Sequence, residues 1–456
     1  MALFSSSNAI AFLFIIIITT TTSNSTPSPT YLKLPLLRHQ TPPFSATQFL
    51  SFDSLRLASL SSKSPIVSGA SLGSGQYLVT INLGSPPQPL QLVADTGSDL
   101  VWTKCSACRN CTDHLNHPHN TAFLARKSSS FRPYHCYDSQ CRLVPHPEIS
   151  QTNTLSLRAA VCNRTRRHSP CRYSYTYADG SETAGFFSTE KTHLNLNSGE
   201  LSELGNLSFG CAFHLAGPSV TGGSFNGAQG VLGLGRGPIS FSTQMGRKFG
   251  NIFSYCLMDY TLSPPPTSFL TIGSLQNDSV LSFTPLITNP LSPTFYYITI
   301  RHVYINKSKL RIDPLLWKLD RFGNGGSVLD SGTTLSFVPK PAYYAILSAF
   351  DRLLVHVPSP AEPTPSFDFC LNMTGAERNV SLPRLRFRLA GGAVFEPPPR
   401  NYFIETEEGV LCLAVQPVGS ESGFSVIGNL MQQGFLFQFD RVESRVGFTR
   451  HGCGLP

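Results

Sequence analysis

Two aspartates stand in closely similar surroundings, and together they have the chemistry of a paired acid and base. In LVADTGSDLVW (92–102) an apolar run ends at Asp95, and in SVLDSGTTLSFV (327–338) another ends at Asp330. Each Asp is followed by a hydroxyl residue, a glycine and a second hydroxyl residue. An aspartate near glycine is also an ordinary turn signal, so one motif alone would predict only a chain reversal. The repetition indicates a shared role.

Two carboxyl groups within hydrogen-bonding distance cannot both ionise easily, so they share one proton and titrate as a pair. The ionised group can take a proton from a water that attacks an amide carbonyl, while the protonated group stabilises the oxygen of the tetrahedral intermediate. Gly97 and Gly332 permit tight turns beside the carboxylates. Four hydroxyl groups can donate hydrogen bonds to them, from Thr96, Ser98, Ser331 and Thr333. The pair therefore predicts hydrolysis of peptide bonds.

Two similar lobes are needed to supply one aspartate each. A weaker similarity follows each motif, GVLGLG at 230–235 and SVIGNL at 425–430, which indicates one duplication on the scale of a small domain rather than a short solenoid repeat. Charged residues make up only 14% of the chain, which favours short strands over long charged helices. Strand candidates are QYLVTINL, TFYYITI and FLFQFD, and the clearest helix is 341–354, with Pro341 in its first turn. We predict an all-β, bilobal fold with a cleft between the lobes.

The N-terminus has features of an exported protein. The apolar run at 9–18 is too short for a convincing membrane span and predicts a secretory signal over residues 1–24. No Lys or Arg precedes the run, so an uncleaved membrane anchor is the alternative. Twelve cysteines, an even number, suit an oxidising compartment. Seven glycosylation sequons follow the signal, at Asn110, Asn163, Asn206, Asn277, Asn306, Asn372 and Asn379.

A cysteine and histidine cluster raises the question of a metal site. Cys105, Cys108 and Cys111 are followed by His114, His117 and His119. Cysteines and histidines at such short spacings can form a zinc-binding site. In an exported chain we expect disulfides instead, among these thiols and with Cys136, Cys141, Cys162 and Cys171, which would staple a polar insertion over 105–171. Cys370 and Cys412 are candidates for a further bridge. We expect no metal.

The charge pattern argues against nucleic acid as a partner. The net charge is +8, but the basic residues form no stripe with interleaved aromatic residues. GLGRG at 233–237 has some likeness to a nucleotide-binding loop, although it lacks the required lysine.

Several motifs, in this order, resemble those of a known family: ADTGSDLVW, YTYADGSETAG, GVLGLG, VLDSGTT and SVIGNLMQQGFLFQFDRVESRVGF. They are similar to the pepsin-like aspartic proteases, and most of all to the cysteine-rich plant branch that includes nepenthesin-like enzymes. The resemblance runs from about residue 75 to the C-terminus. It implies that Asp95 and Asp330 are the catalytic dyad and that Thr96 and Ser331 brace it across the lobe interface, with Ser331 in place of the commoner Thr.

The same resemblance assigns the remaining site residues. Ser98 and Thr333 match the outer hydroxyls that bind each Asp. Tyr177 matches the tyrosine of a hairpin flap that closes over the substrate, and Trp102 matches its indole partner. Ala178 stands where many members have glycine, and its methyl group would narrow the approach of the flap to the substrate backbone.

The resemblance implies a secreted aspartic endopeptidase, active at acidic pH on an extended polypeptide, monomeric and without a cofactor. We expect a signal peptide over 1–24, a prosegment over 25–70, an N-terminal lobe with the cysteine-rich insertion and flap over 71–280, and a C-terminal lobe over 281–456. After signal cleavage no membrane contact is expected. The destination is the extracellular space or cell wall, or else the vacuole. Residues 23–70 show few signs of a core, but YLKLPLLRHQ resembles the start of an inhibitory prosegment, whose Lys33 or Arg38 could approach the carboxylates.

Two alternatives remain open from the sequence. One is a catalytically inert secreted binding protein of the same fold, similar to the plant xylanase inhibitors. The other is a structural glycoprotein of the cell wall. The two intact aspartate motifs and Tyr177 favour the enzyme, because a pure binding protein has no chemical reason to keep them.

Overall fold

The computed structural model describes most of the two lobes. It covers residues 31–38, 76–109, 122–146, 168–177, 180–195, 201–217, 220–221, 228–258, 268–274, 280–360, 367–374, 380–419, 423–450 and 452–454. The predicted signal peptide, Cys111, Cys162, Ala178 and the three histidines 114, 117 and 119 lie outside these residues. The predicted boundaries of the signal, prosegment and lobes stay predictions.

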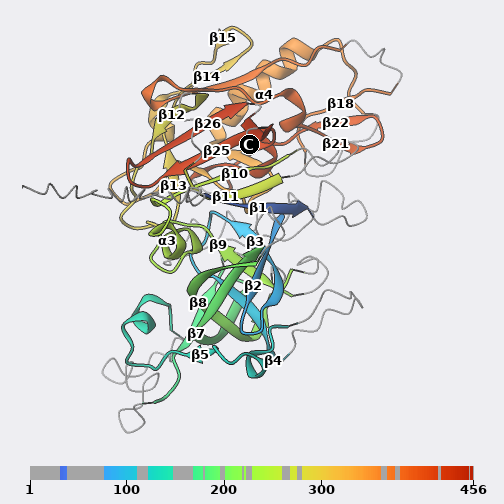
Figure 1. The fold of residues 1–456 in the computed structure, drawn as a ribbon. Coiled ribbons are helices and arrows are strands. Elements are labelled where there is room, and N and C mark those ends of the chain that lie inside the picture. Colours follow the sequence, from blue (N-terminus) through green and yellow to red (C-terminus); the bar gives the residue numbers. More distant parts are fainter. Residues whose placement is uncertain are drawn as a thin grey trace, which may run out of the picture.

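The fold is mostly β, as predicted, and its largest sheet runs through both lobes. Figure 1 shows a lower body that contains β2 to β9 and an upper body that contains β13 to β26, with β1, β10 and β11 between them. The path of this sheet is β12 (Ser282–Pro285), β26 (Arg445–Arg450), β25 (Phe435–Asp440), β10 (Ile252–Cys256), β11 (Ser268–Gly273), β1 (Tyr31–Arg38), β2 (Tyr77–Leu83), β3 (Gln88–Asp95), β9 (Gly230–Gly233), β4 (Trp102–Arg109), β8 (Leu201–Ala216), β7 (Glu182–Asn195) and β5 (Arg132–Pro133), with β6 (Arg172–Thr176) paired to β7.

Three smaller sheets build the rest of the second lobe. The first has the order β13 (Tyr296–Ile298), β16 (Ser327–Leu329), β24 (Ser425–Ile427), β17 (Ser336–Val338) and β23 (Val415–Pro417). The second has the order β15 (Ser308–Lys309), β14 (Ile300–Ile305), β19 (Leu385–Leu389) and β20 (Val394–Phe395). The third has the order β18 (Cys370–Asn372), β22 (Val410–Leu413) and β21 (Phe403–Glu407).

Helices are short and few in the described residues. They are α3 (Phe241–Gly246), α4 (Lys340–Leu354) and α5 (Asn429–Gln432), and 3-10 turns lie at Ala125–Lys127, Ser139–Leu143, Pro314–Trp317, Ala390–Gly392, Pro399–Asn401 and Gly452–Gly454. The predicted helix at 341–354 is confirmed as α4, with proline in its first turn. No helix in the described part of the chain has the length and apolar character to cross a membrane.

The duplication seen in the sequence is a repeated strand arrangement. In the first lobe β9 lies between β3 and β4, parallel to β3 and antiparallel to β4. In the second lobe β24 lies between β16 and β17, again parallel to the first and antiparallel to the second. The motifs GVLGLG and SVIGNL supply these inserted strands. In each lobe, the strand that leads to the aspartate, β3 or β16, pairs with the inserted strand. The aspartate lies at the end of that strand.

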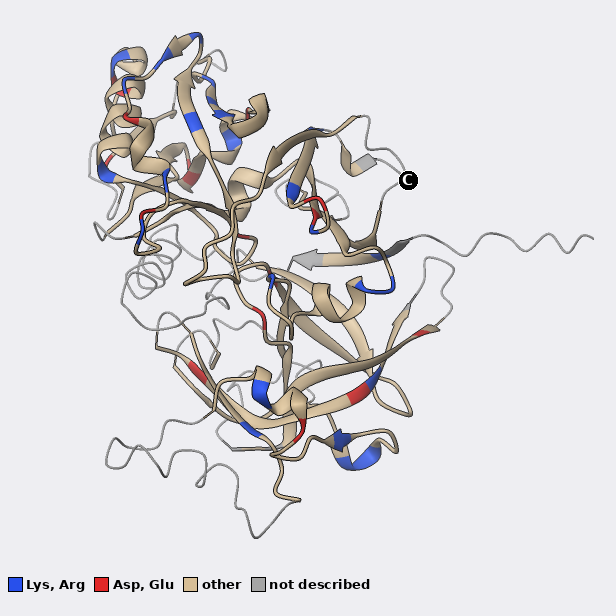
Figure 2. Ribbon diagram, turned by 90° about the vertical axis from the view of Figure 1, so that its left-hand side faces the viewer, with Lys and Arg blue, Asp and Glu red and all other residues tan. Residues whose placement is uncertain are grey.

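Charged residues are scattered over this framework. Figure 2 shows Lys, Arg, Asp and Glu at separate places on the ribbons of both lobes, while most of the ribbon carries none of them. Apolar side chains dominate the core of each lobe instead. In the first lobe Val93, Leu100 and Val231 are fully buried, and in the second Val328 and Leu335 are. Burial of this apolar surface is the main source of the stability that holds the site in place.

One strand was not expected from the sequence. Residues 31–38 form β1, which pairs with β11 on one side and β2 on the other. Leu34 and Leu36 are buried there, so this segment adds to the core even though the sequence of 23–70 showed few signs of one. The Nζ of Lys33 lies 4.2 Å from the centroid of the Phe269 ring, a cation–π contact. Its expected approach to the carboxylates stays a prediction.

The disulfides confirm part of the cysteine prediction and correct another part. The predicted Cys370–Cys412 bridge is present, and Cys141 pairs with Cys171 inside the predicted set. Cys105, however, pairs with Cys211, so the expectation that its partner lay among the insertion cysteines was wrong. The reason is that β4 runs beside β8, which places Thr103 opposite Cys211. A fourth bridge, Cys256–Cys453, ties the C-terminus to β10.

Glycine should be obligatory at Gly428, immediately after the inserted strand of the second lobe. A Cβ there would lie 2.0 Å from the carbonyl oxygen of Leu335, a backbone atom that cannot turn aside. We expect Gly428→Ala to lower the free energy of unfolding by about 3 kcal/mol, the upper end of the usual overpacking range. Gly419→Ala is the matched control, because nothing lies within 4 Å of that Cβ position. Urea denaturation of both variants would check this, and equal stabilities would contradict the predicted close approach.

Candidate active site

Asp95 ends β3 and is held by its own turn. Its Oδ1 accepts a hydrogen bond from the Gly97 amide at 3.0 Å, and its Oδ2 accepts one from the Ser98 hydroxyl. Asp95 and Ser98 are both fully buried. Because a buried carboxyl group without hydrogen-bond partners is costly, these donors offset the burial of Asp95.

Asp330 repeats this arrangement in the second lobe. Its Oδ1 accepts from the Gly332 amide at 2.9 Å, and its Oδ2 accepts from the Thr333 hydroxyl at 2.7 Å. Asp330 is 2% exposed. Both carboxyl groups therefore have one amide donor and one hydroxyl donor, two and three residues further along the chain. The two halves of the predicted site have the same local geometry.

The residues next to the aspartates join the two lobes. The Ser331 amide donates to Thr96 Oγ1 at 2.9 Å, and in return the Thr96 amide donates to Ser331 Oγ at 3.1 Å. Each hydroxyl then donates to a strand of the opposite lobe, Ser331 Oγ to the Ala94 carbonyl at 3.0 Å and Thr96 Oγ1 to the Leu329 carbonyl at 3.4 Å. We call these four contacts the interlobe exchange. They hold the loops of Asp95 and Asp330 against each other.

The two aromatic residues assigned by resemblance also meet. The indole Nε1–H of Trp102 donates a hydrogen bond to the Tyr177 hydroxyl. Tyr177 follows β6, and its ring packs against that of Tyr175, with centroids 5.5 Å apart. The chain turns back at once, since the Tyr177 amide donates to the Ser181 carbonyl at 2.7 Å. Tyr177 thus lies at the base of a hairpin, and its role in a flap stays a prediction.

Tyrosines around the site remain protonated. Burial raises the pKa of Tyr177 well above its ordinary value, and the neighbouring Tyr175 raises it further. Burial likewise raises the pKa of Tyr255, and the charge of Asp330 adds to the effect. These hydroxyls can therefore donate hydrogen bonds over the whole physiological pH range.

Several polar residues that no sequence motif predicted support the two aspartate loops. The Gln432 side-chain amide donates to the Asp330 carbonyl at 3.3 Å, and that of Asn429 donates to the Ser331 carbonyl at 3.1 Å. A third is Asp99, whose carboxyl group contacts both lobes. The second acidic residue in DTGSD was the available signal, because an Asp within a run of buried residues requires a partner.

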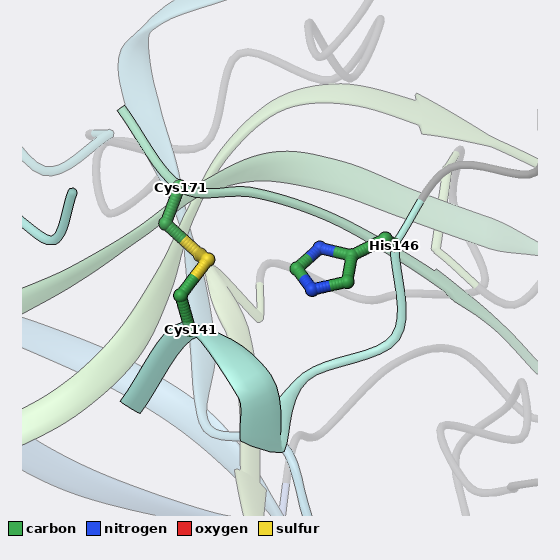
Figure 3. A group of neighbouring side chains, drawn as sticks. All are labelled: Cys141, His146 and Cys171. Carbon is green, nitrogen blue, oxygen red and sulfur yellow. A yellow bond between two sulfur atoms is a disulfide. The ribbon is translucent and has the colours of Figure 1, made fainter. Parts of the chain in front are cut away.

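Among the described residues, Cys141, His146 and Cys171 lie close enough together to suggest a metal site, but they lack the ligands that zinc needs. Figure 3 shows His146 beside the Cys141–Cys171 disulfide, and their ligand atoms lie within 4.8 Å of one another. A disulfide sulfur is no thiolate, and zinc binds the thiolate. His146 Nδ1 lies 2.8 Å from the Arg172 carbonyl oxygen. Cys105 and Cys108, which belong to the sequence cluster that raised the question of zinc, are disulfide-bonded, as expected.

Comparisons with known proteins agree with this geometry. The family model described as Xylanase inhibitor N-terminal matches residues 77–274, and Xylanase inhibitor C-terminal matches residues 295–450. Aspartyl protease family protein 2 of Arabidopsis thaliana is 36% identical over 393 residues, which cover 86% of this chain and 73% of that protein. Aspartic proteinase nepenthesin-1 of Nepenthes gracilis is 34% identical over 401 residues, 87% of this chain and 82% of that protein.

Solved structures share the fold at lower sequence identity. The crystal structure of edgp has a TM-score of 0.68 and 22% identity, with 93% of this chain and 96% of that chain covered. Basic 7S globulin from soybean has a TM-score of 0.64 and 17% identity, with 92% and 96% covered. At such low sequence identity, the similarity to these two structures shows only that the fold is shared. The two family models and the relatives at 36% and 34% identity show that the chain belongs to the pepsin-like aspartic proteases, in the cysteine-rich plant branch of the nepenthesins.

Proposed function

We propose that this protein is an aspartic endopeptidase that hydrolyses peptide bonds with a water molecule activated by Asp95 and Asp330. The observation that carries the proposal is the matched pair of hydrogen-bond sets around the two carboxyl groups, joined by the interlobe exchange. A protein that binds only through its outer surface needs neither the matched donors nor the close contact of the two loops.

The chemistry follows from one proton shared by two carboxyl groups. The ionised carboxylate takes a proton from water as the water oxygen bonds to the carbonyl carbon of the substrate. The protonated carboxyl donates to the carbonyl oxygen and stabilises the tetrahedral intermediate. A proton then passes to the leaving amide nitrogen as the C–N bond breaks, which yields a carboxylic acid and an amine. Because the pair titrates as a unit, we assign neither form to one residue.

The substrate is an extended polypeptide bound between the lobes under the flap. The Tyr177–Trp102 hydrogen bond holds the base of the proposed flap in a defined position. A flap that closes excludes water and strengthens the electrostatic interactions of the dyad. In this proposal the protein acts as a monomer and needs no cofactor.

Export and maturation belong to the same proposal. The signal at 1–24, the cysteine content and the sequons support secretion to the extracellular space or cell wall, or delivery to the vacuole. Two of the sequon residues, Asn206 and Asn306, are exposed, as a glycosylated side chain must be. The prosegment at 25–70 would be removed on activation.

The rival proposal is an inert binding protein. It is supported by the two family models named for xylanase inhibitors. It predicts that the purified mature protein cleaves no denatured protein at any pH. The endopeptidase proposal predicts cleavage in acid, because the shared proton must be present and is lost when the second carboxyl group ionises.

Asp95→Asn and Asp330→Asn should each abolish hydrolysis while the protein stays folded. An amide can be neither the base nor the acid, so each single variant should lose at least about 10³-fold in kcat, and the double variant should lose little more because the two groups act as a unit. Turnover of denatured protein from about pH 3 to 7, a range that spans carboxyl titration, measures this. Circular dichroism checks the fold. Near-normal turnover by either variant would exclude the proposed dyad.

Pepstatin supplies the matched chemical control. We expect it to inhibit the wild-type protein and to leave any residual hydrolysis by the Asn variants unchanged. Activity that resists pepstatin but disappears with a serine-directed or metal-chelating reagent would reject the mechanism.

Ser331 should require its hydroxyl group but tolerate a methyl group. Ser331→Ala removes the acceptor of the Thr96 amide and the donor to the Ala94 carbonyl, and the loss of buried hydrogen bonds of this kind costs about 1–3 kcal/mol. Ser331→Thr keeps the hydroxyl and is the control. We expect the Ala variant to lose stability and kcat and the Thr variant to retain both. Chemical denaturation and initial rates measure this, and equal behaviour of the two variants would show that the interlobe exchange is dispensable.

A further inference from the structure

Asp99 is an acidic residue of the catalytic loop that the dyad mechanism does not use. It follows Asp95 by four residues, and Thr334 follows Asp330 by the same number. The two motifs thus differ at this position, although each has the aspartate, the glycine and both hydroxyl residues. Because only the first motif has a carboxyl group at this position, the role of Asp99 must depend on contacts that the two motifs do not share.

Asp99 contacts three separate segments, two through its carboxyl group and one through its backbone amide. Its Oδ1 accepts from the Gly237 amide at 2.7 Å, in the turn that follows β9. Its Oδ2 accepts from the Thr294 hydroxyl at 2.6 Å, in the segment that enters β13 of the second lobe. The Asp99 amide lies 3.4 Å from the hydroxyl oxygen of Tyr175, on the strand that leads to the flap. The turn after β9, the second lobe and the strand that leads to Tyr177 are therefore all in contact with Asp99.

The glycines of GLGRG leave room for this carboxyl group. A Cβ on Gly237 would lie 2.2 Å from Asp99 Oδ2, and one on Gly235 would lie 2.4 Å from Oδ1. Neither glycine has a positive φ, so it is the space occupied by Asp99, and not the backbone conformation, that excludes a side chain at 237. This accounts for a glycine pattern that the dyad chemistry leaves unexplained.

Polar contacts between the lobes surround the same point. The Arg236 amide donates to the Thr294 carbonyl at 2.9 Å, and Arg441 Nη2 donates to the Arg236 carbonyl at 2.9 Å. The hydroxyl of Tyr296 donates to the Leu234 carbonyl at 2.8 Å. Asp99 lies among these groups and is partly buried.

The connection to the dyad is short. The Ser98 carbonyl accepts from the Gly235 amide at 2.8 Å, and the Ser98 hydroxyl donates to Asp95 Oδ2. If Asp99 left its position, Ser98 would shift with it, because the two are adjacent in the chain. The donor to Asp95 would then move away from the carboxylate.

We propose that Asp99 is a positioning residue for the catalytic dyad, which fixes the Asp95 loop against the Gly235–Gly237 turn and against Thr294 of the second lobe. This inference rests on the proposed endopeptidase function. Asp99 touches no reacting atom. It acts through Ser98 on Asp95, and through Tyr175 on the strand that carries Tyr177.

The charge of Asp99 gives the proposal a second consequence. Burial raises the pKa of the Asp99 carboxyl group, although Thr294, Gly237 and Arg441 lower it. Burial also raises the pKa of Tyr175, and the charges of Asp99 and Asp95 both add to it, so both carboxyl groups act on that hydroxyl. The groups facing Asp99 are thus Tyr175, Arg441 and Tyr296. A negative charge near the dyad favours its protonated form, so loss of that charge should move the basic limb of activity to lower pH.

The first test compares Asp99→Ala with Asp99→Asn. The Ala variant removes both contacts, and we expect kcat to fall about 10²-fold, the effect of a small misplacement of catalytic groups, with KM nearly unchanged. The Asn variant can still accept from Gly237 and can donate to Thr294, so it should recover most of kcat, with its basic limb shifted to lower pH. Thr288→Ala is the control: Thr288 accepts from Arg236 Nη2 at the same junction.

The outcomes separate the two proposals. An inactive wild-type protein would reject the endopeptidase function. An active wild type together with an unimpaired Asp99→Ala variant would reject the positioning role alone. If Asp99→Asn recovers kcat but its pH profile equals that of the wild type, the proposed effect of the Asp99 charge on the dyad is wrong.

A second test needs no activity. In an Asp330→Asn background, which prevents self-cleavage, thermal unfolding of Gly237→Ala, Asp99→Ala and the double variant forms a mutant cycle. We expect Gly237→Ala to lower the unfolding midpoint strongly when Asp99 is present and only slightly when the Asp99→Ala substitution leaves the space free, because neighbouring residues are non-additive. Additive shifts would show that Asp99 does not occupy the space beside Gly237, and would overturn the proposal.

Discussion

The structure depends on one constraint, the exchange of hydrogen bonds between Thr96 and Ser331 across the lobe interface. Each amide donates to the hydroxyl of the other residue, and each hydroxyl donates onward to the carbonyl of the residue just before the opposite aspartate. These groups are buried, so any separation of the lobes leaves polar atoms without partners. The relative position of Asp95 and Asp330 is therefore determined by backbone and hydroxyl geometry rather than by flexible side chains. A shared proton requires that kind of fixed pair.

The duplicated strand arrangement makes this constraint possible. In both lobes an inserted strand pairs with the strand that leads to the aspartate, and a glycine allows close contact with the returning chain, at Gly230 against Trp102 and at Gly428 against Leu335. The lobes differ where the proposed site needs an asymmetric element. The first lobe carries Trp102, Tyr177 and Asp99, while the second carries Gln432 and Asn429. The proposed function requires such unequal additions, because two equivalent carboxyl groups must act on different atoms of one substrate.

The sequence predicted the parts of the site that depend on short motifs. Both aspartate turns, the all-β fold, the helix at α4 and the Cys370–Cys412 bridge could be inferred, because each rests on local residue order or on a strong resemblance. Contacts that depend on strand order could not. The Cys105–Cys211 bridge needs β4 beside β8, which no local pattern reveals. The buried strand β1 was missed although Leu34 and Leu36 alternate, because the surrounding Ser, Pro and Thr obscured a short period-two pattern. Asp99 was missed because its partners, Gly237 and Thr294, are distant in sequence.

The proposed mechanism requires Asp95 and Asp330 to share one proton, and titration of the two carboxyl groups measures this. Carbon NMR of the protein labelled at aspartate Cγ, compared with the two Asn variants for assignment, follows both groups through pH. If the two carboxyl groups share a proton, they should titrate in two coupled steps, one below and one above the ordinary aspartate pKa of about 3.9, and both signals should change in each step. If the two groups instead titrated independently near that ordinary value, the carboxyl groups would not form a dyad, and the proposed mechanism would be contradicted.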